Sequence, residues 1–156
     1  MSEPVAPAHA VRHADARVAR LVQLYETLAP ADLPGLRGVY ADDAHFKDPF
    51  NRVQGLPSIA RIFSHMFRTL DGPRFQVIAA VAEGDEAFLT WDFHFRTRGA
   101  GAAALCIHGA SHVCFNARGQ VATHRDYWDA AEELYEKLPL LGGLMRWLKR
   151  RAGGAS

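Results

Sequence analysis

The stretch Tyr40-Ala41-Asp42-Asp43-Ala44-His45-Phe46-Lys47-Asp48-Pro49-Phe50 marks where a helical hydrophobic pattern ends and a strand-like pattern begins. Proline disfavours helical geometry in the residue before it, so we expect Asp48 to be extended. Phe46 and Phe50 lie two positions away on either side and would share its face of the strand. A carboxyl group in an apolar setting is suited to accept a proton, although half-exposed strand carboxylates without a catalytic role are far commoner. Asp48 is therefore a candidate general base.

The composition indicates a single domain without a nucleic-acid or membrane partner. The chain has 156 residues, of which 49% are hydrophobic, enough for one core. Its 18 Lys and Arg residues nearly balance 17 acidic residues, so no overall field attracts nucleic acid. No segment has the apolar length of a signal peptide or a stable membrane span. Cys106 and Cys114 lie too far apart in one predicted strand to form a disulfide, which favours a reduced, cytoplasmic protein.

The first half of the chain is predicted to be mainly helical. Residues 1–10 have the composition of a disordered lead-in. Apolar residues at helical spacing predict an amphipathic helix over 11–28. Asp32 is expected to cap a shorter helix over 33–40. The clearest helical pattern covers 57–70.

The second half changes to the period of two that is typical of strands. Strands are expected over 75–82, 87–97, 104–115 and 120–128. Asp129 is expected to cap a helix, with Glu132 as its capping-box partner, so that 131–156 forms a C-terminal helical extension with a basic tail. Helices followed by antiparallel strands predict an α+β domain over 11–130. A strongly curved sheet wrapped around the N-terminal helices would leave a cone with a cavity inside.

Three segments of the chain match a known superfamily. They are Val22-Gln23-Leu24-Tyr25, the stretch from Tyr40 to Pro49, and Arg125-Asp126-Tyr127-Trp128-Asp129. With these segments the chain resembles the nuclear transport factor two-like superfamily, and within it the SnoaL-like polyketide cyclases, the ketosteroid isomerases and the limonene epoxide hydrolases. The resemblance implies a cone-shaped, mainly antiparallel sheet (a cystatin-like roll) and usually a homodimer through the outer face of the sheet.

The resemblance also implies roles for individual residues. Tyr25 matches the oxyanion-binding tyrosine of the ketosteroid isomerases, and Asp48 matches their general base. Asp126 matches an aspartate that helps to activate water in the epoxide hydrolases, and Asp92 falls at their second acid. Ser111 stands where the isomerases place a second oxyanion donor, and Thr90 stands where the hydrolases have an arginine, so both patterns are incomplete.

The candidate cavity is expected to combine aromatic walls with a few polar groups. Its predicted lining residues are Phe46, Phe50, Phe63, Met66, Phe67, His94, Ser111, His124 and Trp128. Alternation on the last strand directs His124, Asp126 and Trp128 to one side, and the resemblance directs them inward together with Asp92 and His94. The alternation of the strand over 87–97 favours the opposite orientation for Asp92 and His94, with its apolar face in the core. If that apolar face lay outside instead, it would form a dimer surface.

Three functions remain open from the sequence. The first is acid–base isomerisation, cyclisation or dehydration of a small apolar polyketide-, steroid- or terpenoid-like compound, with Asp48 as base and Tyr25 as donor. The second is binding of such a molecule without chemistry. The third is epoxide hydrolysis through Asp126 and Asp92. No cofactor is indicated, and no metal site either, because His108 and His112 are roughly 13 Å apart along one strand.

Overall fold

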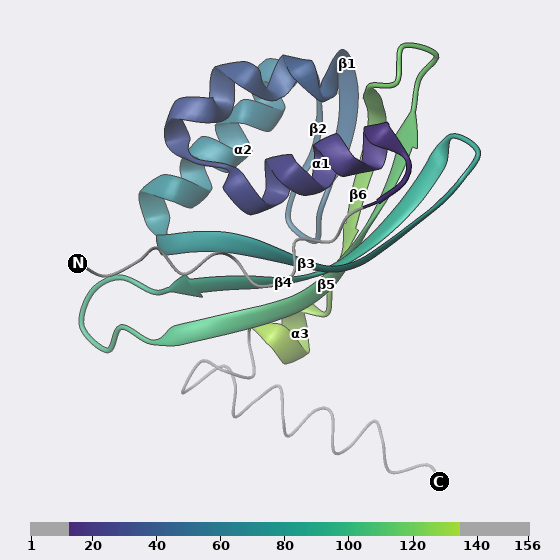
Figure 1. Cartoon of the computed structure of the whole chain (residues 1–156). Helices are drawn as coiled ribbons and strands as arrows, with labels where there is room; N and C mark the ends of the chain where they lie inside the picture. The colour runs from purple at the N-terminus through teal and green to yellow at the C-terminus, as the bar shows by residue number, and fades with distance from the viewer. Residues whose placement is uncertain (1–12, 135–156) are drawn as a thin grey trace, which may run out of the picture.

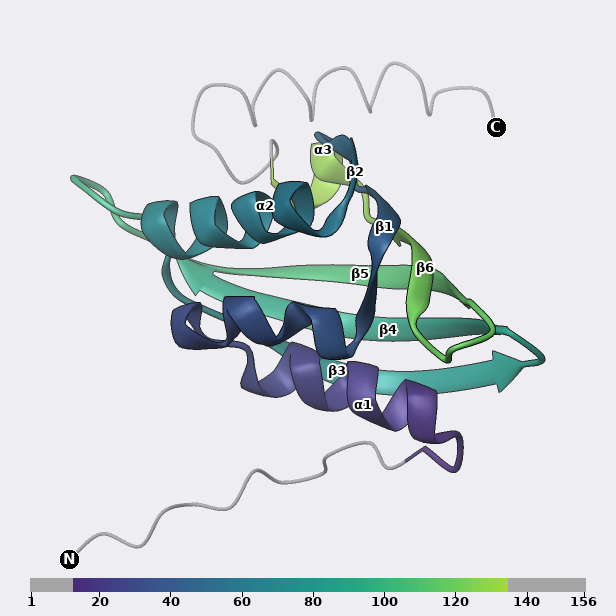
Figure 2. The same ribbon diagram turned by 90° about the horizontal axis from the view of Figure 1, so that it is seen from above.

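The computed structural model describes residues 13–134, in which the helices from the first half of the chain cover one face of a curved, open sheet (Figures 1 and 2). The elements are α1 (Ala16–Thr27), the 3-10 helix η1 (Pro30–Gly38), β1 (Tyr40–Lys47), β2 (Arg52–Gln54), α2 (Leu56–Thr69), β3 (Asp71–Glu83), β4 (Glu86–Arg96), β5 (Ala104–Phe115), β6 (Val121–Tyr127) and α3 (Ala130–Glu133). The strand order is β2-β1-β6-β5-β4-β3, and only the β1–β6 pair is parallel. The predicted α+β class and mainly antiparallel curved sheet are confirmed.

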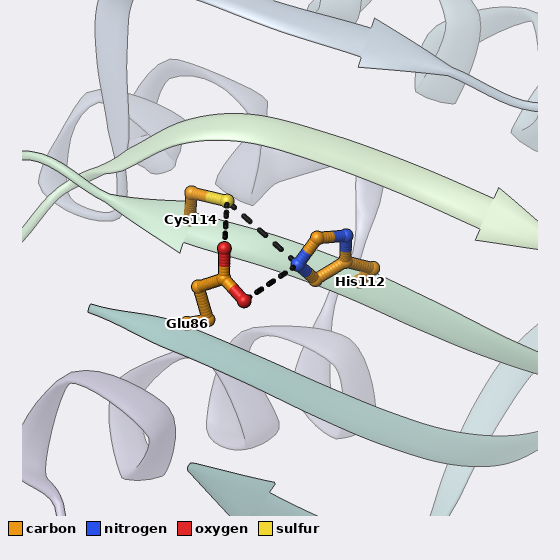
Figure 3. Close-up of side chains that lie close together, drawn as sticks. All are labelled: Glu86, His112 and Cys114. Carbon is orange, nitrogen blue, oxygen red and sulfur yellow. Dashed lines mark hydrogen bonds and ion pairs between the residues drawn. The ribbon is translucent and has the colours of Figure 1, made fainter. Parts of the chain in front are cut away.

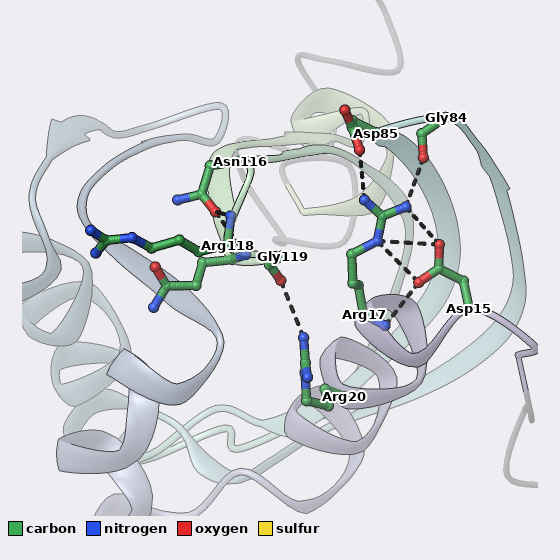
Figure 4. A network of polar contacts seen from close by, with 9 residues as sticks. Asp15, Arg17, Arg20, Gly84, Asp85, Asn116, Arg118 and Gly119 are labelled. Atoms are coloured by element: carbon green, nitrogen blue, oxygen red, sulfur yellow. Dashed lines mark hydrogen bonds and ion pairs between the residues drawn. The ribbon is translucent and has the colours of Figure 1, made fainter.

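The N-terminal half of α1 is tied to two turns of the sheet (Figure 4). Arg17 contacts the β3–β4 turn, and Arg20 donates to the Gly119 carbonyl in the β5–β6 turn at 3.3 Å. Asp15 caps the helix by accepting a hydrogen bond from the Arg17 backbone N–H at 2.8 Å. The Arg17 guanidinium pairs with Asp15 and also reaches the β3–β4 turn, with contacts of 2.7 Å to both the Gly84 carbonyl and Asp85. Hydrogen bonds from Arg17 hold the pKa of Asp15 at about 2. The helix begins at Ala16, directly after this cap and later than the predicted residue 11.

The segment after α1 differs from the predicted second helix. It forms the 3-10 helix η1, and Asp32 lies inside it, where its carboxylate accepts the Ala29 backbone N–H at 3.0 Å. Pro34 removes an interior backbone donor, so a regular α-helix is disfavoured there. Tyr40, expected on this helix, is instead the first residue of β1.

The strand β3 changes face part-way along its length. The register with β4 shifts between Val77 and Ala79, so one extra residue is inserted into β3. Val77 is buried before this bulge, whereas Val81 is 63% exposed after it. The period-of-two pattern of Phe75, Val77, Ala79 and Val81, from which this strand is predicted, therefore does not mark one face, because the bulge moves the later residues to the other face.

The apolar face of β4 packs against the helices. Leu89, Trp91, Phe93 and Phe95 are all buried, whereas the residues between them are exposed or half-buried. We call the face of the sheet that is turned away from α1 and α2 the outer face. The amphipathic pattern of the strand thus predicted its orientation correctly, and its large apolar side chains are covered within one chain.

The predictions for the two ends of the chain lie almost entirely outside the described residues. The lead-in over 1–10 and nearly all of the C-terminal extension over 131–156 fall there, apart from α3. At α3 the predicted cap is confirmed, since Asp129 accepts the backbone N–H groups of Ala131 and Glu132. Cys106 and Cys114 are not joined to each other by a disulfide. Within residues 13–134, none of the helices has the length and apolar character needed to cross a membrane.

Candidate functional site

A cavity of about 360 Å³ lies between α2 and the inner face of the sheet. Its walls are mainly aromatic and include Phe46, Phe63, Phe75, Trp91, Phe93 and Phe95. Phe50 and Trp128, whose rings meet edge to face at 5.4 Å, also line it. Asp48 and Asp126 are the carboxylates in its lining. A concave apolar space with a few polar groups is the usual form of a small-molecule site.

The cavity carboxylate of Asp126 rests on a buried hydrogen-bond network. Asp126 follows His124 by two positions on β6, and His124 Nε2 lies 2.6 Å from Asp126 Oδ1. The Ser111 hydroxyl, from the cross-strand partner on β5, donates to the same oxygen at 2.6 Å. Ser111 in turn accepts the indole N–H of Trp91 at 2.8 Å. Three strands thus fix one carboxylate oxygen.

Two tyrosines complete the support of His124. The Tyr25 hydroxyl on α1 lies 2.8 Å from His124 Nε2 and 3.1 Å from Ser111 Oγ. The Tyr40 hydroxyl lies 2.7 Å from His124 Nδ1. In the tautomer with its proton on Nε2, His124 can donate to Asp126 while Nδ1 accepts from Tyr40.

The two tyrosines stay protonated at neutral pH. Burial is the main cause that raises the pKa of Tyr25 well above its ordinary value, with Tyr40 and the charge of Asp126 adding to it. Burial, followed by the charge of Asp126, also raises the pKa of Tyr40. Each phenol therefore keeps a proton to donate into the network.

One oxygen of Asp126, a residue of the cavity lining, has no hydrogen-bond partner among the described residues. All of its hydrogen bonds to the residues over 13–134 use Oδ1, and none uses Oδ2. The side chain is 14% exposed, compared with 1% for His124. Asp126 therefore lines the cavity with one carboxylate oxygen fixed by hydrogen bonds and the other able to accept one from a bound molecule.

Asp48, the predicted base, also lines the cavity but is engaged in a turn. Its Oδ1 accepts the backbone N–H groups of Phe50 at 2.8 Å and Asn51 at 2.6 Å. The Asn51 side-chain amide donates to both carboxylate oxygens at 3.0 Å. Asp48 lies just after β1 rather than within a strand, because Asp-Pro-Phe-Asn makes the tight turn into β2. Asp48 therefore bonds within this turn, whereas Tyr25 bonds to the network behind Asp126.

Asp92 and His94 lie away from the cavity, so the expectation that they face it is wrong. They alternate with the inward-facing Trp91 and Phe93 and therefore point to the outer face. Asp92 there contacts His108 Nδ1 at 2.6 Å. Thr90 shares this outward orientation. Asp126 and Asp92 lie on opposite faces of the sheet, so the two carboxylates cannot activate the same water molecule. This arrangement removes the geometric basis for epoxide hydrolysis.

The other predicted lining residues divide into two groups. Phe46, Phe50, Phe63, Met66 and Trp128 line the cavity as expected, and Phe67 does not. Ser111 and His124 lie behind its wall, 0% and 2% exposed, where they hold Asp126. The sequence prediction missed Tyr40 and Trp91 as members of the network. The alternation along β4 indicates that the Trp91 ring lies on the inner face. Its hydrogen bond to Ser111 could not be predicted, because it depends on the register between neighbouring strands.

Comparison with known proteins identifies the family. The model of the SnoaL-like domain matches residues 21–124, about two thirds of the chain. The chain belongs to the SnoaL-like domain family. The matched region of this SnoaL-like chain includes Tyr25, Asp48, Ser111 and His124, and ends two residues before Asp126. The comparison with curated proteins found no match.

Solved structures agree on the fold of this SnoaL-like chain. A protein from Shewanella putrefaciens CN-32, provisionally assigned as a SnoaL-like polyketide cyclase, is 15% identical, with a TM-score of 0.65 over 78% of this chain and 98% of that one. AclR from Streptomyces galilaeus, provisionally assigned as a hydroxylase, is 18% identical, with a TM-score of 0.63; the match covers 79% of this chain and 97% of AclR. A ketosteroid isomerase-like protein from Catenulispora acidiphila DSM 44928, solved with trimethylamine, is 15% identical, with a TM-score of 0.65 over 76% and 89%. At these identities the likeness establishes the fold.

Proposed function

We propose that this SnoaL-like protein catalyses acid–base isomerisation, cyclisation or dehydration of a small apolar carbonyl compound, with Asp126 as the group that moves the proton. The observation that carries this proposal is the Asp126 carboxylate, which lines an aromatic cavity and has one oxygen held by Ser111 and His124 while the other accepts no hydrogen bond from the described residues. Apolar walls suit a polyketide-, steroid- or terpenoid-like skeleton.

The proposed step is a proton transfer within the cavity. Asp126 Oδ2 accepts a proton from a carbon next to the carbonyl, and the electron pair of the C–H bond moves into the enolate. The same carboxyl group then returns the proton at another position of the substrate. General acid–base catalysis of this kind contributes roughly 10² to 10⁴ in rate, which suits a C–H bond that the substrate already makes acidic.

The network behind Asp126 orients the carboxylate during this transfer. The side chains of His124 and Ser111 keep Oδ1 in place, and Tyr25 and Tyr40 keep His124 in place. In this proposal Tyr25 acts through His124 and Ser111 rather than on the substrate carbonyl. Asp48, which stands as the alternative base, shapes the rim of the cavity through its turn.

The test compares the two cavity carboxylates. Asp126→Asn keeps an acceptor at Oδ1 for Ser111 and His124 but cannot take a proton at the open position. Turnover is measured on a panel of cyclic β,γ-unsaturated ketones and β-dicarbonyl compounds by ultraviolet absorption. We expect Asp126→Asn to lower the rate by about 10² to 10⁴, whereas the matched variant Asp48→Asn keeps most of it. Loss of rate in Asp48→Asn alone would assign the base to Asp48 and contradict the proposal.

The second candidate function is binding of the same class of molecule without chemistry. It is favoured by the position of Ser111, whose hydroxyl is fully buried and already bonded to Asp126, Tyr25 and Trp91. No second oxyanion donor is then supplied from that position. Saturable quenching of tryptophan fluorescence by a panel compound, with no change in its absorption, would support this function.

We also propose that the protein forms a homodimer through the outer face of the sheet. Exposed apolar side chains support this proposal: Val81 is 63% exposed, and its cross-strand neighbour Phe88 is 48% exposed. Tyr127, on the same face, is 48% exposed. Apolar groups gathered on one face are a signal of association.

A further inference from the structure

The outer face of β4 and β5 brings together a carboxylate, an imidazole and a thiol that the proposed reaction does not use (Figure 3). Glu86, the first residue of β4, is the cross-strand partner of Cys114, and His112 precedes Cys114 by two positions on the same face of β5. The ligand atoms of the three side chains all lie within 4.8 Å of one another.

The separations of these atoms match a tetrahedral metal site. His112 Nε2 lies 3.6 Å from Glu86 Oε2, and Cys114 Sγ lies 3.8 Å from His112 Nε2 and 3.9 Å from Glu86 Oε1. Bond lengths of about 2.0 to 2.3 Å at tetrahedral angles require separations of roughly 3.4 to 3.6 Å between ligand atoms. The His112–Cys114 separation exceeds this range by only a few tenths of an ångström. The two contacts of Glu86 use different oxygens, so its carboxylate must turn to offer one oxygen to the same ion.

Neighbouring side chains hold the imidazole in position. The Phe88 ring, directly across the strand pair, stacks on His112 with centroids 4.4 Å apart and an angle of 5° between the planes. This stacking restricts the imidazole to the plane in which Nε2 faces Glu86 and Cys114. Arg125, the cross-strand partner of His112 on β6, places its guanidinium 4.7 Å from the centre of the Tyr127 ring.

We propose that Glu86, His112 and Cys114 bind one divalent transition-metal ion of the zinc type. A thiolate and a carboxylate together neutralise a dication, and imidazole, thiolate and carboxylate are all ordinary zinc ligands. Three protein ligands leave a fourth tetrahedral position for water or a further ligand. The ion would clamp the start of β4 to the end of β5.

A second group on the same face serves as an internal comparison. Asp92, His94 and Cys106 also lie within 4.8 Å of one another. There, however, Asp92 Oδ1 is already engaged by His108 at 2.6 Å, so an ion must displace that contact. The group of Glu86, His112 and Cys114 is held only by weak contacts of 3.6 Å or more and is the site that the geometry favours.

Titration with Co²⁺ tests the proposal on the full-length protein without a polyhistidine tag, reduced with a phosphine. We expect one Co²⁺ per chain, a thiolate-to-cobalt charge-transfer band in the near ultraviolet, and displacement of the Co²⁺ by Zn²⁺. Cys114→Ser should abolish the band and weaken binding by more than about 100-fold, because loss of an outer partner alone costs 10- to 100-fold. His112→Gln should weaken binding similarly.

Cys106→Ser is the matched control, since it removes a thiol from the same strand and the same face. We expect it to leave the band and the stoichiometry unchanged. A band that is absent from the wild type, survives Cys114→Ser, or disappears in Cys106→Ser would overturn the proposal. A stoichiometry of one ion for two chains, checked by sedimentation, would also overturn it, because the site would then belong to the assembly.

Discussion

Tyr40 and His124 form a deeply buried contact of the site, in which the Tyr40 hydroxyl is the partner of His124 Nδ1. Tyr40→Phe removes that hydroxyl and leaves the buried ring nitrogen with only a longer contact of 3.5 Å to the Tyr25 hydroxyl. We expect a loss of about 1 to 3 kcal/mol in the free energy of unfolding, measured by urea denaturation. Tyr127→Phe is the control at an exposed position, with an expected change within about 0.5 kcal/mol. Equal effects of the two variants would show that the network does not stabilise the fold.

A second residue-scale prediction concerns Asp15, whose pKa is lowered from 3.8 to about 2 by hydrogen bonds from Arg17. A lowered pKa in the folded state stabilises the fold above pH 3.8, and this stabilisation is lost as the pH falls through about 2. Asn caps a helix about as well as Asp, so Asp15→Asn removes mainly the charge. We expect the wild type to be more stable than Asp15→Asn at pH 6, with the difference vanishing near pH 2 in urea titrations. A constant difference would refute the assignment.

At the scale of elements, β5 depends on a glycine where it passes the Trp91 ring. Gly109 is the cross-strand partner of Trp91, and a Cβ at this position would lie 2.6 Å from Cζ2 of the indole. Gly109→Ala should therefore displace the ring from Ser111 and from the cavity wall. We expect a loss of about 1 to 3 kcal/mol in unfolding free energy and weaker ligand binding.

Gly38→Ala is the matched control, because a Cβ at this position would meet no atom of the described residues within 4 Å and the backbone there is not left-handed. Its expected effect is neutral or stabilising by up to about 1 kcal/mol. If Gly109→Ala proved as harmless as Gly38→Ala, the close packing of Trp91 on β5 would not matter for stability.

Prediction from sequence worked best for elements with a regular period. The helix over 57–70 and the strand over 104–115 differ little from α2 and β5, because one apolar stripe and clear turn residues bound them. It failed at β3, where a bulge between Val77 and Ala79 changes the face. It also placed Asp48 within a strand, whereas the residue lies in the turn between β1 and β2 and its carboxylate bonds within that turn.

At the scale of the whole molecule, the inward direction of His124, Asp126 and Trp128 was predictable, but their partners were not. The contact of Ser111 with Asp126 depends on the β5–β6 register, which includes an irregularity at Cys114 and Phe115. The contact of Tyr25 with His124 depends on how α1 lies across the sheet. Spacing along one strand carries no information about either arrangement.

The proposed dimer gives a further prediction at this scale. Val81→Glu places a charge in the exposed apolar outer face without touching the cavity, and we expect it to convert a dimer into a monomer in sedimentation experiments. Phe50→Ser is the control, since Phe50 is 55% exposed but lies at the cavity. A dimer that persists in Val81→Glu and is lost in Phe50→Ser would place the interface elsewhere.

The central claim is that Asp126 moves a proton of a molecule held in the aromatic cavity. Its most direct measurement is the exchange of the α-hydrogens of a cyclic β,γ-unsaturated ketone in D₂O, followed by proton NMR with wild type, Asp126→Asn and Asp48→Asn. The account predicts enzyme-dependent exchange that falls by about 10² to 10⁴ in Asp126→Asn and is largely retained in Asp48→Asn. Exchange in Asp126→Asn as fast as in the wild type would contradict it.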